Sequence, residues 1–510
     1  MLNSEITISI ATDQHGSDRE TVTCIPGQTV LEVLQAANIT LNATCGGRGT
    51  CGKCRVLIED SDGLNYRLAC RTLATSGMLI IANEPKEMLI QETGNGLSHE
   101  VDEGGEGYAV AIDVGTTTVV CRLFDLTSGA VRGVASSVNP QVVFGADVMS
   151  RIDASIAGKL TDMQVLLLDT LRDLIVDLCK AAGISLKDVV RIGLAANTVM
   201  EHIAAGLPPD SIGVAPFTPL SLFNDEHHFK ELPVPVWFAP AIYGYVGGDI
   251  TAGILATAMD KAARPQLLVD LGTNGEIALG DSSGILCAAT AAGPVFEGAG
   301  IHFGMPALPG AVATVKLSGD DLELSVIGNE APLGICGSGL IDIVALLRNE
   351  GVLDAGGRMV DRTELSEFWA ARSGEENGVK VIYLTLDHSL YITQIDVRQL
   401  QLAKGAICAG INTLLEKLGI STADIETLQI AGGFGRALDL KSAAVIGLFP
   451  AELLDCAVSA GNTAIEGISA AMLSSKAKQR LGQLTELCTY IELSADARFN
   501  ELFIEALGFS

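Results

Sequence analysis

Aromatic and positively charged residues are scarce in this chain of 510 residues. Phe, Trp and Tyr make up 5% of the sequence, and 33 Lys and Arg stand against 61 Asp and Glu, which gives a formal net charge of −28. A surface this acidic repels the phosphates of nucleic acids and anionic lipid headgroups. We therefore expect no nucleic acid and no membrane among the partners; a protein with a positive patch would suit this surface.

Long apolar runs are also missing. No segment approaches the roughly 20 uninterrupted apolar residues that span a bilayer. The first ten residues, MLNSEITISI, lack the basic and apolar regions of a signal peptide. We expect a cytoplasmic protein. With 48% hydrophobic residues, the composition is that of a globular chain, and the length suits several domains.

Four of the twelve cysteines cluster near the N-terminus. Cys45, Cys51 and Cys54 follow the spacing C-x5-C-x2-C in a glycine-rich stretch, and Cys70 comes after fifteen more residues. Thiolates suit both iron–sulfur clusters and zinc. The glycines favour a cluster, because they let backbone N–H groups point at its sulfurs. Zinc, or cysteines with only a structural role, remain the alternatives.

The other eight cysteines are scattered singly in apolar segments, so we interpret them as small buried hydrophobic residues. They are Cys24, Cys121, Cys179, Cys287, Cys336, Cys408, Cys456 and Cys488.

The segments around the cysteine cluster predict a small domain over residues 1–83. Residues 5–11 and 19–25 alternate like two strands, a short helix follows from Pro26, and strands return at Cys54 and Gly77. This order resembles the β-grasp [2Fe–2S] ferredoxins. The resemblance implies one [2Fe–2S] cluster on the four clustered cysteines.

Residues 84–107 are rich in glycine and acidic residues, which is typical of a flexible linker. A mobile tether would let the cluster domain swing between an electron donor and an acceptor. The alternative is a tether that only connects two domains.

A strand that ends in D-x-G-T and continues into a second strand occurs twice in residues 108–510. The first copy contains Asp113 and the second contains Asp270, so the two form an internal pseudo-repeat. Glycine lets the backbone approach a ligand closely, and hydroxyls and backbone N–H groups in such turns bind phosphate. Asp113 and Asp270 would hold Mg²⁺, mostly through water. The candidate nucleotide-binding residues of the two turns are Gly115, Thr116, Thr117, Thr118, Gly272, Thr273, Asn274 and Gly275.

A third glycine-rich turn follows a late strand, at Gly432, Gly433 and Gly435, where the backbone could pass close to a purine or ribose. Lys404, on a preceding amphipathic helix, could lie beside the nucleotide or on a solvated helix face. The three motifs in this order resemble the actin–sugar kinase–Hsp70 superfamily. That resemblance implies two RNase H-like lobes, roughly 108–265 and 266–510, which close over ATP with Mg²⁺.

Asp249 follows YGYVGG, between the two D-x-G-T motifs. Superfamily members place a residue that orients the attacking water in this region, so Asp249 could be a general base or a Mg²⁺ neighbour. The alternative is an N-cap of the helix that follows. His202, in NTVMEHI, is better interpreted as a packed or capping histidine than as a cobalt ligand.

Four further stretches, YGYVGGDITAGILA, AAGPVFEGAGIHFGM, GICGSGLIDIVALL and GNTAIEGISAAML, resemble the reductive activators of corrinoid-dependent enzymes. That family joins a [2Fe–2S] domain to an actin-like ATPase, which is a multidomain α/β fold. The resemblance implies that ATP helps an electron pass from the cluster to an inactive Co(II) corrinoid protein and restores Co(I). It also implies an upstream low-potential electron donor; a homodimer is one option for the assembly.

Two other functions remain compatible with the sequence. One is the ATP-dependent activation of another redox or dehydratase enzyme, although no paired cysteine motif follows residue 70. The other is a nucleotide-sensing ferredoxin scaffold that binds ATP without turnover. A small-molecule kinase would leave the cluster without a purpose.

Overall fold

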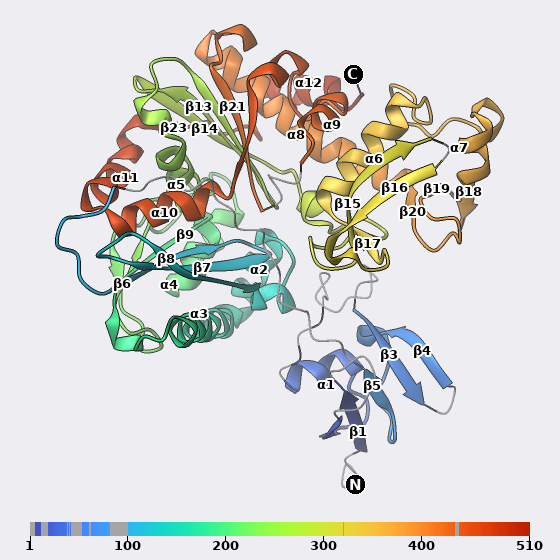
Figure 1. The fold of residues 1–510 in the computed structure, drawn as a ribbon, viewed down its shortest axis with the longest axis horizontal. Helices are drawn as coiled ribbons and strands as arrows, with labels where there is room; N and C mark the ends of the chain where they lie inside the picture. The colour runs from blue at the N-terminus through green and yellow to red at the C-terminus, as the bar shows by residue number, and fades with distance from the viewer. Residues whose placement is uncertain are drawn as a thin grey trace.

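A computed structural model gives the fold of the chain (Figure 1). The residues that the structure describes are 6–11, 19–37, 39, 41, 54–60, 63–81, 100–319, 321–433 and 438–509. In these ranges, no helix combines the length and the apolar character needed to cross a membrane.

The N-terminal sheet has five strands in the order β2-β1-β5-β3-β4. Its β1 strand pairs antiparallel with β2 and parallel with β5, and α1 (Val30–Ala36) packs its apolar face onto the sheet. Thr29 and Glu32 cap this helix reciprocally. The strands are β1 (Ile6–Ala11), β2 (Arg19–Cys24), β3 (Arg55–Asp60), β4 (Gly63–Leu68) and β5 (Leu79–Ile81).

Two six-stranded sheets form the larger part of the chain, and their topologies correspond. In each sheet, three consecutive strands form an antiparallel meander, and a later strand pairs parallel with the first strand of the meander. This parallel pair is β6 with β9 in the first sheet and β12 with β21 in the second. The first sheet has the order β10-β11-β9-β6-β7-β8, and the second has the order β22-β21-β12-β13-β14-β23. The pseudo-repeat in the sequence is therefore a structural repeat, and the actin-like fold class is confirmed.

The strands of the first sheet are β6 (Tyr108–Val114), β7 (Thr118–Asp125), β8 (Val131–Val138), β9 (Val189–Ala196), β10 (Glu226–His227) and β11 (Val236–Phe238). Those of the second are β12 (Gln266–Leu271), β13 (Gly275–Asp281), β14 (Gly284–Thr290), β21 (Thr427–Ala431), β22 (Ala457–Gly461) and β23 (Cys488–Tyr490).

Two helices, α5 (Gly248–Thr257) and α10 (Thr463–Leu473), lie between the two large sheets (Figure 1). One core joins the layers, with Ala111 and Phe124 of the first sheet, Leu268 of the second, Ile254 of α5 and Ile468 of α10. The late helix α10 also packs directly on β6 and β9. The inner face of the first sheet is thus completed by residues from near the end of the chain.

The outer face of the first sheet is covered by α3 (Leu160–Ala182), and α8 (Gln394–Leu418) packs on β13 and β14. Two three-stranded sheets are inserted in the chain between β14 and β21: β15 (Ala311–Ser318), β16 (Asp321–Val326) and β17 (Gly334–Ile335); and β18 (Ser373–Glu376), β19 (Val379–Tyr383) and β20 (Tyr391–Thr393). The remaining helices are α2 (Val148–Ala154), α4 (Thr198–Ala205), α6 (Gly337–Asn349), α7 (Glu367–Arg372), α9 (Leu440–Val445), α11 (Ser475–Leu487) and α12 (Ala497–Glu505).

The end of the expected linker, residues 100–107, packs against the larger part of the chain. Asp102 accepts hydrogen bonds from the backbone N–H and the hydroxyl of Ser475 (2.9 and 2.7 Å) and from Arg191 (3.3 Å). These contacts fix the last part of the segment for which the composition predicts flexibility.

Candidate functional site

Two of the four predicted cluster ligands lie together in the N-terminal domain. Cys54 precedes β3, Cys70 follows β4, both are buried, and their sulfurs are 3.2 Å apart. The backbone N–H of Cys70 points at the Cys54 sulfur (3.5 Å). Two converging thiols with an amide donor fit the ligation of an iron–sulfur cluster. Cys45 and Cys51 lie outside the described residues.

Five of the eight scattered cysteines are buried and three are partly exposed. The interpretation as small buried residues is confirmed for Cys24, Cys121, Cys179, Cys287 and Cys336, while Cys408, Cys456 and Cys488 are only partly buried.

The two D-x-G-T turns face each other across a cavity of about 1300 Å³. Asp113 lies near the end of β6 and Asp270 near the end of β12, and each strand turns into its antiparallel neighbour. The predicted nucleotide-site residues that line the cavity are Asp113, Gly115, Thr116, Thr117, Thr118, Asp249, Asp270, Gly272, Thr273, Asn274, Gly432 and Gly433.

Gly275, in contrast, is not among the lining residues. It pairs with Leu271 and Thr290 inside the sheet, where a Cβ atom would lie 2.7 Å from the Thr290 hydroxyl. The structure thus places Gly275 in the packing of β13. Gly435 lies outside the described residues.

Gly432 closes the site from the second sheet. Its φ is +123°, and a Cβ atom there would lie 2.5 Å from the Leu271 carbonyl oxygen. Only glycine fits this close approach without strain, so the third turn is held directly against the end of β12.

Three aspartates, Asp113, Asp249 and Asp270, line the cavity. Burial raises the pKa of Asp270 to about 8, with added repulsion from Asp249 and Asp113. Burial, reinforced by Asp113, raises the pKa of Asp249 to about 7. Buried carboxyl groups that gain from a nearby cation fit a site for Mg²⁺ with a nucleotide. Among the described residues, no three His, Cys, Asp or Glu side chains converge closely enough to ligate a metal ion together.

Asp249 lies in the first turn of α5, and the N-cap position falls on Gly247. Its carboxylate accepts the N–H of the adjacent Ile250 (2.8 Å) and lines the cavity. The N-cap interpretation therefore does not fit, and the carboxylate faces the site.

Four residues that the sequence did not single out support the turns. The Asn462 amide donates to Asp113 (2.6 Å) while its oxygen caps α10. Asn197 donates to the Thr116 hydroxyl (3.3 Å). Glu297 accepts hydrogen bonds from Thr117 and Thr273. Arg151, fully buried beneath the first turn, donates to the Thr116 carbonyl.

Glu297 had a signal in the sequence, because it is the one acidic residue in the apolar, glycine-rich stretch AAGPVFEGAG. Asn462 also lies in one of the stretches that carry the family resemblance, GNTAIEGISAAML, whereas Asn197 and Arg151 come from segments with no motif that points to the cavity.

Lys404 is not at the cavity. Its ammonium is buried, donates to the Gly508 carbonyl, and lies over the Phe509 ring. Both interpretations of Lys404, beside the nucleotide or on a solvated face, are therefore wrong, since the helix packs on the C-terminal segment. His202 is a packed histidine as expected: it contacts the Thr198 carbonyl (2.7 Å) and accepts the N–H of Leu220 (3.0 Å).

Comparisons with known proteins cover the same three parts of the chain. Residues 13–75 match the 2Fe-2S iron-sulfur cluster binding domain, residues 108–262 match the RACo middle region, and residues 264–510 match the C-terminal domain of RACo, the ASKHA domain. These domains fit a [2Fe–2S] cluster and ATP with Mg²⁺.

Two curated relatives and one solved structure are similar over most of their length. The chain is 30% identical to the corrinoid activation enzyme RamQ of Eubacterium limosum, covering 93% of this chain and 95% of the relative. It is 26% identical to a [Co(II) methylated amine-specific corrinoid protein] reductase of Methanosarcina barkeri, over 79% and 77% of the two chains. A solved reductive activator for corrinoid, iron-sulfur protein superposes with a TM-score of 0.72 at 29% identity, over 99% and 98% of the two chains.

Identity at this level over nearly the full length, with the three matched regions in one order, shows that this chain belongs to the family of reductive activators of corrinoid proteins.

Proposed function

We propose that this chain is an ATP-dependent reductive activase that transfers one electron to the Co(II) centre of a corrinoid protein and restores Co(I). The observation that carries the proposal is one chain with both a buried thiol pair, Cys54 and Cys70, and a cavity between two opposed phosphate turns. The names of its relatives support this reaction.

We assign residues 1–83 to the cluster domain, 84–107 to the linker, and 108–510 to the ATPase, with lobes near 108–265 and 266–510. Cys45, Cys51, Cys54 and Cys70 would hold the [2Fe–2S] cluster. When bound, the cluster supplies a one-electron carrier, which a low-potential donor re-reduces. We infer a cytoplasmic protein, because a reducing compartment suits low-potential electron transfer. A homodimer is the assembly to test.

In the nucleotide site, the backbone and hydroxyl groups of the turns 115–118 and 272–274 would bind phosphate oxygens. Asp113 and Asp270 would hold the water shell of Mg²⁺. Asp249, whose burial keeps its pKa at about 7, would accept a proton from the attacking water. ATP can favour electron transfer only by stabilising a conformation in which the transfer is downhill.

The test is anaerobic visible spectroscopy of a Co(II) corrinoid protein mixed with this protein and a low-potential reductant. We expect the Co(I) band only when ATP is present, and we expect Asp270→Ala to abolish it while the cluster spectrum is retained. ATP hydrolysis with no cobalt reduction across several corrinoid proteins would instead support the activation of a different enzyme. Binding without hydrolysis would support a scaffold.

A further inference from the structure

We propose that Glu297 is a specificity-determining residue of the nucleotide cavity, whose carboxylate competes with the terminal phosphate of ATP for the hydroxyl groups of the two turns. The inference depends on the nucleotide site proposed above. Glu297 would make this site distinguish ATP from ADP.

One carboxylate oxygen connects the two turns. The hydroxyl of Thr117, in the first turn, and that of Thr273, in the second, both donate to Oε2 of Glu297, the latter at 2.8 Å. These two threonines follow equivalent strands, β6 and β12, of the two large sheets. The carboxylate therefore joins the two lobes at the place where hydroxyls are expected to meet phosphate oxygens.

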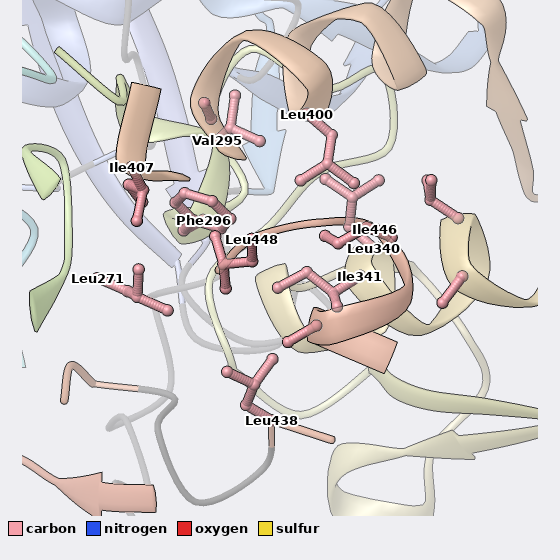
Figure 2. Close-up of a cluster of buried hydrophobic side chains, with 14 of the residues drawn as sticks. Leu271, Val295, Phe296, Leu340, Ile341, Leu400, Ile407, Leu438, Ile446 and Leu448 are labelled. Carbon is pink, nitrogen blue, oxygen red and sulfur yellow. The ribbon is translucent and has the colours of Figure 1, made fainter. Parts of the chain in front are cut away.

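The segment that carries Glu297 is firmly fixed. Val295 and Phe296, directly before it, are buried, and Figure 2 shows both in a cluster with residues such as Leu340, Leu400 and Leu448. Burial of these apolar side chains stabilises the position of the segment in the core. After Glu297, Gly298 takes a φ of +76° and turns the chain away. The carboxylate is thus presented by the core and not by a loose loop.

A buried cation lies behind the first turn. Arg151 donates to the carbonyls of Thr116 and Gly145 and to the Gln141 side chain, and none of its hydrogen-bond partners among the described residues is a carboxylate. The negative charges that act on it through space are Glu297 and Asp147. A buried guanidinium needs a nearby negative charge, and Glu297 supplies one from within the cavity.

A phosphate bound to the same two hydroxyls would stand next to the Glu297 carboxylate. Two anions cannot share these donors without strong repulsion, so binding of the terminal phosphate and the Thr117–Glu297–Thr273 bridge exclude each other. ADP lacks that phosphate and leaves the bridge in place. Glu297 therefore lowers the affinity for ATP relative to ADP, and ATP must break a contact between the lobes when it binds.

Calorimetric titration of the full-length protein with Mg²⁺ and either ADP or a non-hydrolysable ATP analogue tests this. We expect Glu297→Gln, which weakens the bridge and removes the charge, to bind the ATP analogue about tenfold tighter and ADP within about twofold of the natural protein. Glu276→Gln is the matched control, since this buried carboxyl lines the same cavity but contacts Asn274 instead of the bridge. It should shift both affinities by a similar factor.

The outcomes separate the two proposals. If the natural protein binds neither nucleotide, the proposed function fails. If it binds both, and Glu297→Gln binds the ATP analogue no tighter or more weakly, then Glu297 assists the phosphate and the inference is overturned. ADP binding checks the fold of the variant; should Glu297→Gln not fold, Glu297→Asp, which shortens the side chain and weakens the bridge, must show the same preference for the ATP analogue.

Discussion

The carboxyl group of Asp270 lies in a cavity where three acidic neighbours, Asp249, Asp113 and Glu297, disfavour its ionised form. Since its pKa in the folded protein is about 8, well above that of an exposed aspartate, the folded state binds more protons than the unfolded state between these two values. The contribution of the Asp270 carboxyl group to the stability of the folded state is therefore complete at low pH and is lost as the pH rises through 8.

In the absence of nucleotide and metal, the free energy of unfolding should therefore fall by about 1–3 kcal/mol between pH 6 and pH 8. Urea unfolding at the two pH values measures this. Asp270→Asn should reduce the dependence, and Mg²⁺ with ADP should also reduce it because a cation favours the ionised carboxylate. If Asp270→Asn keeps the pH dependence of the natural protein, the ionisation of Asp270 is not its cause.

Cys54 and Cys24 are both buried in the same small core, but we propose only Cys54 as a cluster ligand. Only Cys54 lies beside Cys70, at 3.2 Å between sulfurs. We expect Cys54→Ala to lose the visible absorbance of the cluster and Cys24→Ala to keep it. Nucleotide affinity, measured by calorimetry, should stay within about twofold of the natural protein in both variants. A substitution in one core has little effect on a distant site with which it shares no contacts. Loss of the absorbance in both variants would point to misfolding of the domain.

At the scale of single elements, the start of α10 contacts the first D-x-G-T turn. Asn462 accepts the N–H of Ile465 (2.9 Å) and donates to Asp113 (2.6 Å). Asn462→Asp keeps a favoured N-cap but places a carboxylate against Asp113. We expect little change in the melting temperature and at least a roughly tenfold loss of affinity for ATP with Mg²⁺, since like charges at this distance repel.

A cap remote from the cavity gives the control for that experiment. Ser366 caps α7 through the N–H of Trp369, so Ser366→Ala should lower the free energy of unfolding by about 1 kcal/mol without changing nucleotide affinity. If Asn462→Asp binds ATP as well as the natural protein does, the contact with Asp113 has no role in binding.

Local elements were predictable because their signals are local. The D-x-G-T turns at Asp113 and Asp270 each combine an apolar strand, a glycine and hydroxyl residues within a few positions, so the sequence indicates both the strand and the chemistry. The strand β4, Gly63–Leu68, was missed, since its polar residues lack a clear alternation.

Partners from distant segments could not be predicted in this way. Asn462 reaches Asp113 across 349 positions, and Glu297 reaches Thr117 across 180. The position of Lys404 was predicted wrongly for the same reason. The C-terminal segment that buries it has no sequence pattern that indicates where it packs.

At the scale of the whole molecule, Asp102 attaches residues 100–107 to α11 and to β9 of the first large sheet. It receives the first N–H and the hydroxyl of α11 at Ser475 and contacts Arg191. Asp102→Ala should lower the free energy of unfolding by about 1–2 kcal/mol, as expected for the loss of a capping carboxylate. The cluster spectrum should not change.

The control for Asp102 is an exposed ion pair on α3. Asp177 contacts Lys180 (3.2 Å) with both side chains mostly exposed, so Asp177→Ala should change the stability by roughly a few tenths of a kcal/mol. Urea unfolding compares the two variants. Equal effects would mean that the contact of residues 100–107 with α11 is as weak as a surface ion pair.

The position of α10 between the two sheets also determines when the inner face of the first sheet can be buried during synthesis. Ala111 and Phe124, on the inner face of the first sheet, are covered by a helix that begins at Thr463. A ribosome has therefore made most of the chain before that cover exists. During translation this apolar face stays exposed until α10 is made. We expect the nascent chain to need chaperones, and we expect chains that end before Thr463 to aggregate.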